Sequence, residues 1–259
     1  MKSYPQPDYR MPSPNAKITD GILRSERFND IYFSSENGLA EVRHVFIEGT
    51  RLADQLKSND HLVIAETGFG TGLNFLTVLD LLKKLDVVCT IDYISFEAYP
   101  LDKQTAFEAR KPFRELKMYS SLLFESWPDS WACSHHRLFL NDRVHLHLHY
   151  GDACVQMKQL DFKADVWFLD GFSPSKNADL WRGDIFYQIA RLSSLKARFA
   201  TYSVASSVKE GLFKSGFIIE KQKGFGNKRE MLVGYKKNTS ILRRSLNQNK
   251  NVIVIGAGI

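Results

Sequence analysis

Four acidic residues of this chain stand at the ends of apolar runs that have the length of β-strands. They are Glu66, Glu97, Asp152 and Asp170. In an open parallel sheet the carboxyl ends of the strands gather at one crevice, so we expect these carboxylates to lie close together. Carboxylates there can hold ribose hydroxyls, bind a cationic group or accept a proton. Each acid taken alone is more simply a solvated loop residue or a helix N-cap.

A glycine-rich turn follows the first of these acids, and Gly68, Gly70 and Gly72 alternate with other residues in it. Glycine lets the backbone approach a ligand where a Cβ atom would clash. The dinucleotide fingerprint G-x-G-x-x-G has a different spacing, and Glu66 just before the turn would repel a pyrophosphate. S-adenosylmethionine carries an ammonium, a sulfonium and no phosphate, so the pattern favours this methyl donor over NAD. The alternative is a plain strand-to-helix turn.

The elements that must position these residues belong to an α/β fold. Apolar runs and helical patterns predict a Rossmann-like class I methyltransferase fold, with a central, mostly parallel seven-stranded sheet, an N-terminal extension and a helical insertion at about residues 101–135. Residues before about 30 are predicted to be extended or loop-like, and Gly216 is predicted to cap a helix. We divide the chain into an extension packed on the main domain, a methyltransferase domain, a basic linker and the first strand of a truncated FAD-binding domain, at residues 1–50, 51–235, 236–250 and 251–259.

The composition is typical of a globular cytoplasmic protein. Of the 259 residues 44% are hydrophobic and 25% charged, and neither a signal peptide nor an apolar stretch of membrane-spanning length is visible. Cys89, Cys133 and Cys154 have no paired spacing, which is typical of reduced thiols. Five basic and no acidic residues lie at 236–250, so a net charge of +6 for the whole chain leaves +1 for residues 1–235. Net charge therefore does not indicate RNA binding by the main domain.

Three longer motifs resemble the methyltransferase half of the MnmC family, bacterial bifunctional enzymes of tRNA wobble-uridine modification. They are ETGFGTGLNF at residues 66–75, FLDGFSPSKN at 168–177 and KGFGNKREML at 223–232, and residues 30–34 and 38–41 match the N-terminal part of the family. The similarity covers about residues 28–235. It implies methyl transfer from S-adenosyl-L-methionine to the 5-aminomethyl group of 5-aminomethyl-2-thiouridine at the tRNA wobble position, which gives 5-methylaminomethyl-2-thiouridine.

In the same family an FAD-dependent oxidoreductase domain follows, and residues 252–259 resemble its first strand. The resemblance implies that this other half makes the amine by removing a carboxymethyl group. We therefore expect FAD to belong to the part that the chain lacks, and we expect the chain alone to methylate the amine without producing it.

The resemblance and the strand ends together suggest a role for each candidate residue. Asp170 is the candidate catalytic residue, as a general base or by orienting the amine; a helix N-cap or a ligand of the donor's amino group is an equal alternative. We expect Glu66 at the methionine part of the donor, Glu97 at the ribose and Asp152 with Ala153 at the adenine. The expected cofactor contacts are Glu66, Gly68, Phe69, Gly70, Asn74, Glu97, Asp152, Ala153 and Asp170.

The candidates for contact with a tRNA anticodon loop are Phe172, Lys176, Lys228 and Arg229. A splayed uridine can stack on an aromatic ring while basic side chains hold phosphates. Core packing is the simpler role for Phe172, and a solvated hairpin turn is an equal alternative for Lys228 and Arg229.

Two rival functions are an NAD- or FAD-dependent oxidoreductase and a non-catalytic RNA-binding module on a methyltransferase fold. Glu66 and the glycine spacing argue against the first, and the intact set of acids and glycines argues against the second. The alternating His145, His147 and His149 share one strand face. No cysteine or further histidine nearby has ligand spacing, so we expect no metal site.

Overall fold

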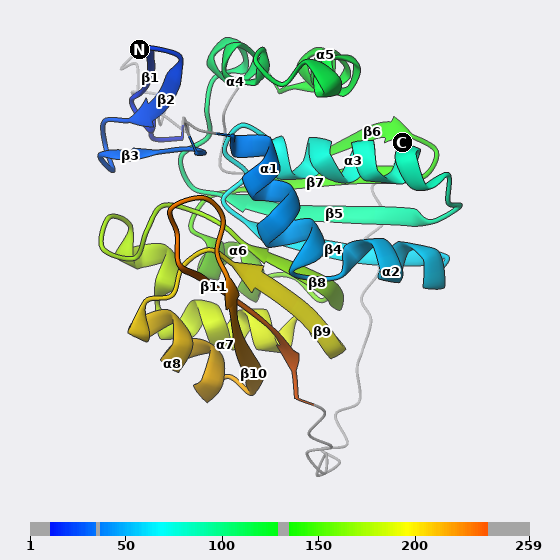
Figure 1. The fold of residues 1–259 in the computed structure, drawn as a ribbon, viewed down its shortest axis with the longest axis vertical. Helices are drawn as coiled ribbons and strands as arrows, with labels where there is room; N and C mark the ends of the chain where they lie inside the picture. Colours follow the sequence, from blue (N-terminus) through cyan, green and yellow to red (C-terminus); the bar gives the residue numbers. More distant parts are fainter. Residues whose placement is uncertain (1–10, 35–36, 129–134, 238–259) are drawn as a thin grey trace, which may run out of the picture.

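The computed structural model describes residues 11–34, 37–128 and 135–237 (Figure 1). At its centre is an eight-stranded sheet with the strand order β10-β11-β9-β8-β4-β5-β7-β6. Helices lie on both faces of this sheet, which confirms the predicted α/β class. Cys133, the linker beyond residue 237 and the predicted strand at 251–259 lie outside the described residues.

Five strands form the parallel part of the sheet. The central strand β4 (His61–Thr67) pairs with β5 (Thr90–Glu97) on one side and with β8 (Ala164–Leu169) on the other. Beyond them lie β7 (Val144–Tyr150) and β9 (Ser193–Thr201). Because β5 and β8 lie on opposite sides of β4, the strand order reverses between β4 and β8. Ligands of open α/β sheets bind outside the carboxyl ends of the strands at such a switch point.

Antiparallel strands complete the sheet at both edges. The predicted pair of closing strands is confirmed as β10 (Phe217–Lys223) and β11 (Glu230–Lys236), and β11 pairs with β9. At the other edge β6 (His135–Asn141) pairs with β7, which makes eight strands and corrects the prediction of seven. The sequence predicts a polar loop at His135 and His136, whereas the structure places both residues at the start of β6.

Helices on each face of the sheet pack on a hydrophobic core of their own. One face carries α1 (Gly38–Val42), its π-helical continuation at Arg43–Glu48, α2 (Leu52–Ser58) and α3 (Leu73–Leu85). The other carries α6 (Ala153–Lys158), a 3-10 turn at Ala178–Trp181, α7 (Gly183–Arg191) and α8 (Ser206–Lys214). The predicted cap is confirmed, since Gly216 follows α8 with a φ of +87°.

The N-terminal extension, which the sequence predicts to be extended or loop-like, forms a small antiparallel sheet. A hairpin joins β1 (Ala16–Thr19) to β2 (Ile22–Ser25), and β3 (Asp30–Ile31) pairs with β2. The turn residues Asp20 and Gly21 both have positive φ, as in the tight hairpin turns that match strand twist. The short polar strands gave no period-2 signal, so the prediction missed them.

The predicted helical insertion is confirmed as α4 (Lys103–Arg110) and α5 (Lys117–Ser126), joined through a 3-10 turn at Arg114–Leu116. Arg110 is only 1% exposed. Its guanidinium donates hydrogen bonds to the Thr71 carbonyl and to the Ser120 hydroxyl, so it ties the insertion to the glycine turn. Within the described residues no helix has both the length and the apolar character that crossing a membrane requires.

Candidate active site

The glycine turn between β4 and α3 packs directly against the end of β8. Gly68 and Gly70 have φ angles of +79° and +51°, a region that other residues rarely adopt. A Cβ atom at Gly68 would lie 3.2 Å from the Asp170 carbonyl oxygen, and one at Gly70 would lie 3.2 Å from the Tyr32 ring. The Thr67 hydroxyl also donates a hydrogen bond to the Asp170 carbonyl (2.8 Å). The turn thus joins both strands at the switch point.

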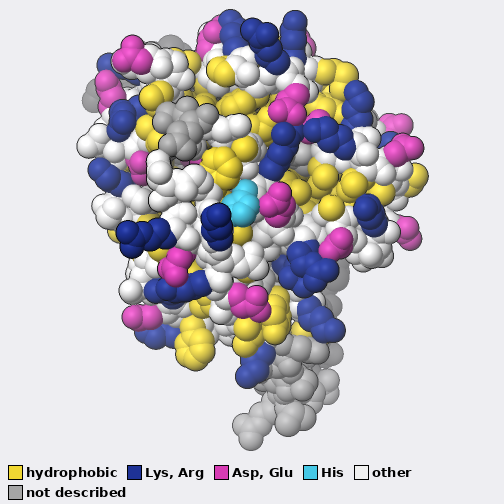
Figure 2. Space-filling model, viewed as in Figure 1, with side chains coloured by type: hydrophobic (Ala, Val, Ile, Leu, Met, Phe, Trp, Pro, Cys, Tyr) yellow, Lys and Arg dark blue, Asp and Glu magenta, His cyan; other side chains and the backbone are white. Residues whose placement is uncertain are grey.

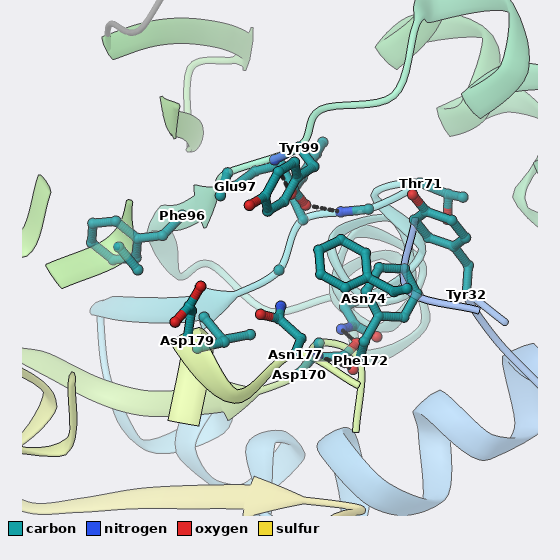
Figure 3. Close-up of a pocket in the computed structure, with 18 of the residues that line it drawn as sticks. Tyr32, Thr71, Asn74, Phe96, Glu97, Tyr99, Asp170, Phe172, Asn177 and Asp179 are labelled. Carbon is teal, nitrogen blue, oxygen red and sulfur yellow. Dashed lines mark hydrogen bonds between the residues drawn. The ribbon is translucent and has the colours of Figure 1, made fainter. Parts of the chain in front are cut away.

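A cavity of about 340 Å³ lies beside this turn, at the carboxyl ends of β4, β5 and β8. Its volume falls in the range of small-molecule sites. In Figure 3 Asp170 and Asn74 lie near Phe172, while Glu97 and Tyr99 lie across the cavity from them. All predicted cofactor contacts except Glu66 line it: Gly68, Phe69, Gly70, Asn74, Glu97, Asp152, Ala153 and Asp170.

Glu97 is held in a fixed position on the cavity wall. One of its carboxylate oxygens accepts a hydrogen bond from the Gly70 N–H (2.9 Å), and the other accepts one from the Tyr99 N–H (2.8 Å). Burial raises the pKa of Glu97, while the backbone donors act in the opposite direction. The backbone donors thus fix the carboxylate on the wall of the cavity that it lines.

Asp170 is joined to a second carboxyl group through one amide. The Asn74 Nδ2 atom donates to Asp170 Oδ2 (2.8 Å) and to Glu66 Oε1 (2.7 Å). The other Asp170 oxygen accepts the Gly171 N–H (2.7 Å). Burial raises the pKa of Asp170 to about 6, against the hydrogen bonds from Gly171 and Asn74. Asp170 is therefore ionised above this pH. Hydrogen bonds to both of its carboxylate oxygens fix its orientation.

Glu66 lies behind Asn74 and does not line the cavity. Its side chain is completely buried, and its second oxygen accepts a hydrogen bond from the Ser95 hydroxyl (2.7 Å). Burial raises the pKa of Glu66 to about 8, and the nearby Asp170 charge adds to this rise. Glu66 is thus mostly neutral at pH 7. Its predicted contact with the methionine part of the donor stays a prediction, and the described contacts reach the cavity only through Asn74.

Asp152 caps the helix that borders the cavity opposite β4. Its Oδ1 atom accepts the Val155 N–H (3.0 Å), so the N-cap alternative holds for this acid. Its Oδ2 atom also lies 3.1 Å from an Arg182 nitrogen. Asp152 and Ala153 nevertheless line the cavity, as the predicted adenine contact requires.

Phe172 is partly buried in a cluster of aromatic side chains. Its ring stacks on Phe28, with centroids 4.8 Å apart, and meets Tyr32 edge-on at 5.0 Å. The cluster lines the cavity, so packing and a role in ligand binding are compatible for Phe172.

A second cavity, of about 360 Å³, adjoins the first at Asp170, which lines both. Its lining shares Tyr32, Asp170 and Tyr202 with the first cavity and adds Glu41 and Lys228. The Lys228 side chain is 46% exposed, and its ammonium lies 2.6 Å from a Glu41 carboxylate oxygen; its contact with tRNA stays a prediction. Asp170 therefore stands in the wall between two spaces.

The other two predicted RNA-binding residues, Lys176 and Arg229, lie outside the linings of both cavities, and their side chains are exposed. Figure 2 shows that Lys and Arg side chains on this face are spread out among Asp and Glu, without a continuous basic stripe. A role for these two residues in tRNA binding stays a prediction.

Two of the alternating histidines, together with His61, lie around the side chain of Asp92. His145 Nδ1 and His61 Nε2 each lie 3.0 Å from an Asp92 oxygen, and His147 Nε2 lies 3.4 Å from one. His149 is buried and stacks on Phe96. In the described part of the chain no group of three or more His, Cys, Asp or Glu side chains is arranged to hold a metal ion.

Sequence reasoning missed four side chains of the second cavity, which are Asp30, Tyr32, Glu41 and Tyr202. Three of them come from the extension and α1, far from the strand ends. The only signal was the match of residues 30–34 and 38–41 to the family's N-terminal part, which carried no chemistry of its own.

The family model of an S-adenosyl-L-methionine-dependent methyltransferase matches residues 114–237. Two curated relatives are named "tRNA 5-methylaminomethyl-2-thiouridine biosynthesis bifunctional protein MnmC". The one from Magnetococcus marinus is 43% identical over 85% of this chain and 33% of its own length, and the one from Aeromonas hydrophila is 38% identical over 92% and 38%. This chain thus spans about a third of the length of these relatives.

The crystal structure of MNMC2 from Aquifex aeolicus has the same fold. It is 26% identical, with a TM-score of 0.68, and the match covers 88% of this chain and 71% of that one. The family model covers the C-terminal half of the described fold, and the two curated relatives cover most of the chain. The chain therefore belongs to the S-adenosyl-L-methionine-dependent methyltransferases, as the methyltransferase part of the MnmC family.

Proposed function

We propose that the chain methylates the 5-aminomethyl group of 5-aminomethyl-2-thiouridine at the tRNA wobble position, with S-adenosyl-L-methionine as donor, to give 5-methylaminomethyl-2-thiouridine. The observation that carries this proposal is the position of Asp170 at the switch point, in the wall between two cavities. One cavity suits the donor and the other an acceptor. The names of the relatives support the choice of acceptor.

The first cavity fits the donor in shape and in chemistry. Gly68 and Gly70 leave open the backbone space that side chains would fill. Glu97 presents a fixed carboxylate for the ribose hydroxyls, and Asp152 with Ala153 borders the space for the adenine. When bound, S-adenosyl-L-methionine supplies a methyl group on a positively charged sulfur, and the acidic lining at Asp170 suits this charge better than it would suit a pyrophosphate.

Asp170 orients the acceptor nitrogen and takes part in its loss of a proton. A primary amine has a pKa near about 10, and its protonated form has no lone pair with which to accept a methyl group. The pKa of Asp170, raised to about 6, makes it a stronger base than an ordinary aspartate while it stays ionised at pH 7. Asn74 and Gly171 hold the carboxylate still, so much of its effect comes from alignment.

The proposed partners are the anticodon loop of tRNA and, in the full-length protein, an FAD-dependent oxidoreductase domain that produces the amine. The proposed location is the cytoplasm, where tRNA is modified. Lys176 and Arg229, whose side chains are exposed, are proposed to contact the phosphates of the tRNA.

The test is transfer of a labelled methyl group to two tRNAs, one with the aminomethyl nucleoside and one with its carboxymethylaminomethyl precursor. We expect label in the wobble nucleoside of the first tRNA only. Label in neither would contradict methylation and favour the non-catalytic RNA-binding alternative, and label in both would contradict the need for a separate oxidoreductase domain. The shift of the melting temperature with S-adenosyl-L-methionine, compared with the shift with NAD, distinguishes a methyltransferase from the oxidoreductase alternative.

A further inference from the structure

The second cavity holds an ion pair between two segments that are far apart in the sequence. Glu41 lies in α1, and Lys228 lies in the turn between β10 and β11. The Lys228 ammonium is 2.6 Å from Glu41 Oε1 and 4.1 Å from the centre of the Tyr202 ring. The Glu41 side chain is 12% exposed and that of Lys228 46%. The carboxylate is therefore the buried partner and the lysine the accessible one.

Glu41 and Tyr202 are both fixed in place by the backbone. The second Glu41 oxygen accepts a hydrogen bond from the Ser34 N–H (3.2 Å). The Tyr202 hydroxyl donates to the carbonyl of Gly171, the residue after Asp170. A flexible lysine stem, by contrast, can leave without disturbing either group.

The same cavity places Glu41 in the electrostatic field of Asp170. After burial, the Glu41 charge raises the pKa of Asp170 and the Lys228 charge lowers it. Burial and the charges of Asp170, Asp30 and Glu41 likewise raise the pKa of Tyr202. Three acidic residues, Asp30, Glu41 and Asp170, thus line the same cavity as Tyr202 and Lys228.

Lys228 ends in a primary ammonium on a methylene group, which is also the end of an aminomethyl substituent. A carboxylate and the face of a tyrosine ring are a favourable combination for such a cation. We propose that Glu41 and Tyr202 form the subsite that recognises the aminomethyl ammonium of the substrate, and that Lys228 occupies this subsite until the substrate displaces it. The inference rests on the proposed function and names the residues that select its acceptor.

The subsite also selects against the carboxymethylated form of the same nucleoside. That form carries an additional carboxylate on the amine, which would face Asp30, Glu41 and Asp170 in the cavity. Like charges in a partly buried space repel strongly. The acceptor is therefore a primary ammonium without a neighbouring anion.

The first test replaces Glu41 with glutamine, which keeps the size and the acceptor for the Ser34 N–H. Binding of the nucleoside 5-aminomethyl-2-thiouridine is measured by calorimetry, and methylation kinetics are measured with the aminomethyl tRNA. We expect Glu41→Gln to weaken nucleoside binding and raise the tRNA KM about tenfold, with kcat within about threefold. The matched control is Glu230→Gln, which removes a carboxylate that pairs with Lys221 (2.8 Å) on the same hairpin but lies outside both cavity linings.

The second test replaces Lys228 with methionine, and the expected change in affinity for the nucleoside has the opposite sign. If Lys228 occupies the subsite, its removal frees the subsite and tightens binding of the nucleoside, which has no phosphate, by about threefold or more. Nucleoside binding that is unchanged or weaker in Lys228→Met would overturn the inference and assign Lys228 to phosphate contact or packing. This variant keeps the inference testable if Glu41→Gln does not fold, which its melting temperature reports.

The possible outcomes distinguish a failure of the proposed subsite from a failure of the proposed function. A wild-type chain that binds the nucleoside but does not methylate it contradicts the proposed function alone. A wild-type chain that methylates, together with a Glu41→Gln KM within twofold of wild type, contradicts the subsite alone. Absence of nucleoside binding to the wild-type chain contradicts both.

Discussion

Asp170 lines two cavities that are formed by different kinds of groups: the first is the proposed donor side and the second the proposed acceptor side. The donor side consists of strand ends, a glycine turn and backbone N–H groups, which fix Glu97 within one compact unit. The acceptor side is assembled from side chains of the extension, α1 and a hairpin turn, with an ion pair between Glu41 and Lys228. The first arrangement is set by local backbone geometry, whereas the second depends on tertiary packing and one flexible side chain. We therefore expect changes on the two sides to act on different steps.

Asp170→Asn should give the largest effect, because this residue belongs to both sides. The amide keeps the size of the side chain but cannot accept a proton. We expect the single-turnover methylation rate to fall by about 10²–10⁴-fold, while the dissociation constant of S-adenosyl-L-methionine changes by less than about threefold. Rapid-quench kinetics and calorimetry measure the two quantities. A near-native rate would make Asp170 a structural residue and remove the link between the two sides.

Glu66→Gln tests the buried group behind the donor side. The raised pKa of about 8 means that Glu66 keeps its proton in the folded protein, whereas in the unfolded chain it is ionised above its ordinary pKa of 4.5. Its favourable contribution is therefore complete below pH 4.5 and is lost as the pH rises toward 8. Between pH 6.5 and 8 the wild-type free energy of unfolding should fall by about 2 kcal/mol from this group.

Glu66→Gln should remove most of that slope. The window above pH 6.5 avoids Asp170, whose pKa is raised to about 6, and His149, whose pKa burial lowers to about 4. Urea titrations at several pH values measure the slope. Equal slopes for wild type and variant would mean that Glu66 is ionised in the folded protein, and the electrostatics of the donor side would then need revision.

Gly68→Ala should weaken binding at the donor side alone, and the effect should be smaller than that of Asp170→Asn. An alanine at φ +79° is strained by about 1–2 kcal/mol, and its Cβ would press on the Asp170 carbonyl oxygen at 3.2 Å. We expect donor affinity to fall about tenfold, with nucleoside binding at the acceptor side little changed. Gly183→Ala is the matched control, because nothing lies within 4 Å of its Cβ position and its φ is not in the positive range. Equal loss of donor and nucleoside binding would show that the sides are not independent.

Replacement of Lys176 and Arg229 by glutamine should have the mildest effect. Both residues are exposed and outside the cavity linings, so the double variant should leave nucleoside methylation unchanged and weaken tRNA binding a few-fold. If both contact single-stranded phosphates, the slope of log K against log salt should decrease by about 1.4. An unchanged slope would place the tRNA path on other basic residues.

The contrast between the sides also explains what the sequence could predict. The central strands as segments of the chain, the glycine turn, and the places of Glu97, Asp152 and Asp170 at or just after strand ends follow from local patterns, because each pattern determines its own backbone. Asn74 was part of the motif, although its bridge between two carboxyl groups appears only when β4, β8 and α3 meet.

The acceptor side could not be predicted in this way. Glu41 reads as an ordinary helix-surface acid, and Lys228 as a solvated turn residue, until the fold brings them to 2.6 Å. The N-terminal strands β1 and β2 were missed for a related reason, since segments of four residues are too short to show a hydrophobic period. Similarly, nothing in the sequence indicates that Asn74 covers Glu66 or that burial raises the pKa of Glu66.

The most direct test of the two-sided site is a crystal structure of the chain with S-adenosyl-L-homocysteine and 5-aminomethyl-2-thiouridine, a pair that cannot react. The account predicts the homocysteine compound in the cavity that Gly68, Glu97 and Asp152 line. It also predicts the nucleoside in the cavity of Glu41 and Tyr202, with its amine within hydrogen-bond distance of Asp170 and with the Lys228 ammonium displaced. A nucleoside bound away from Asp170, or one that leaves the Glu41–Lys228 pair intact, would contradict it.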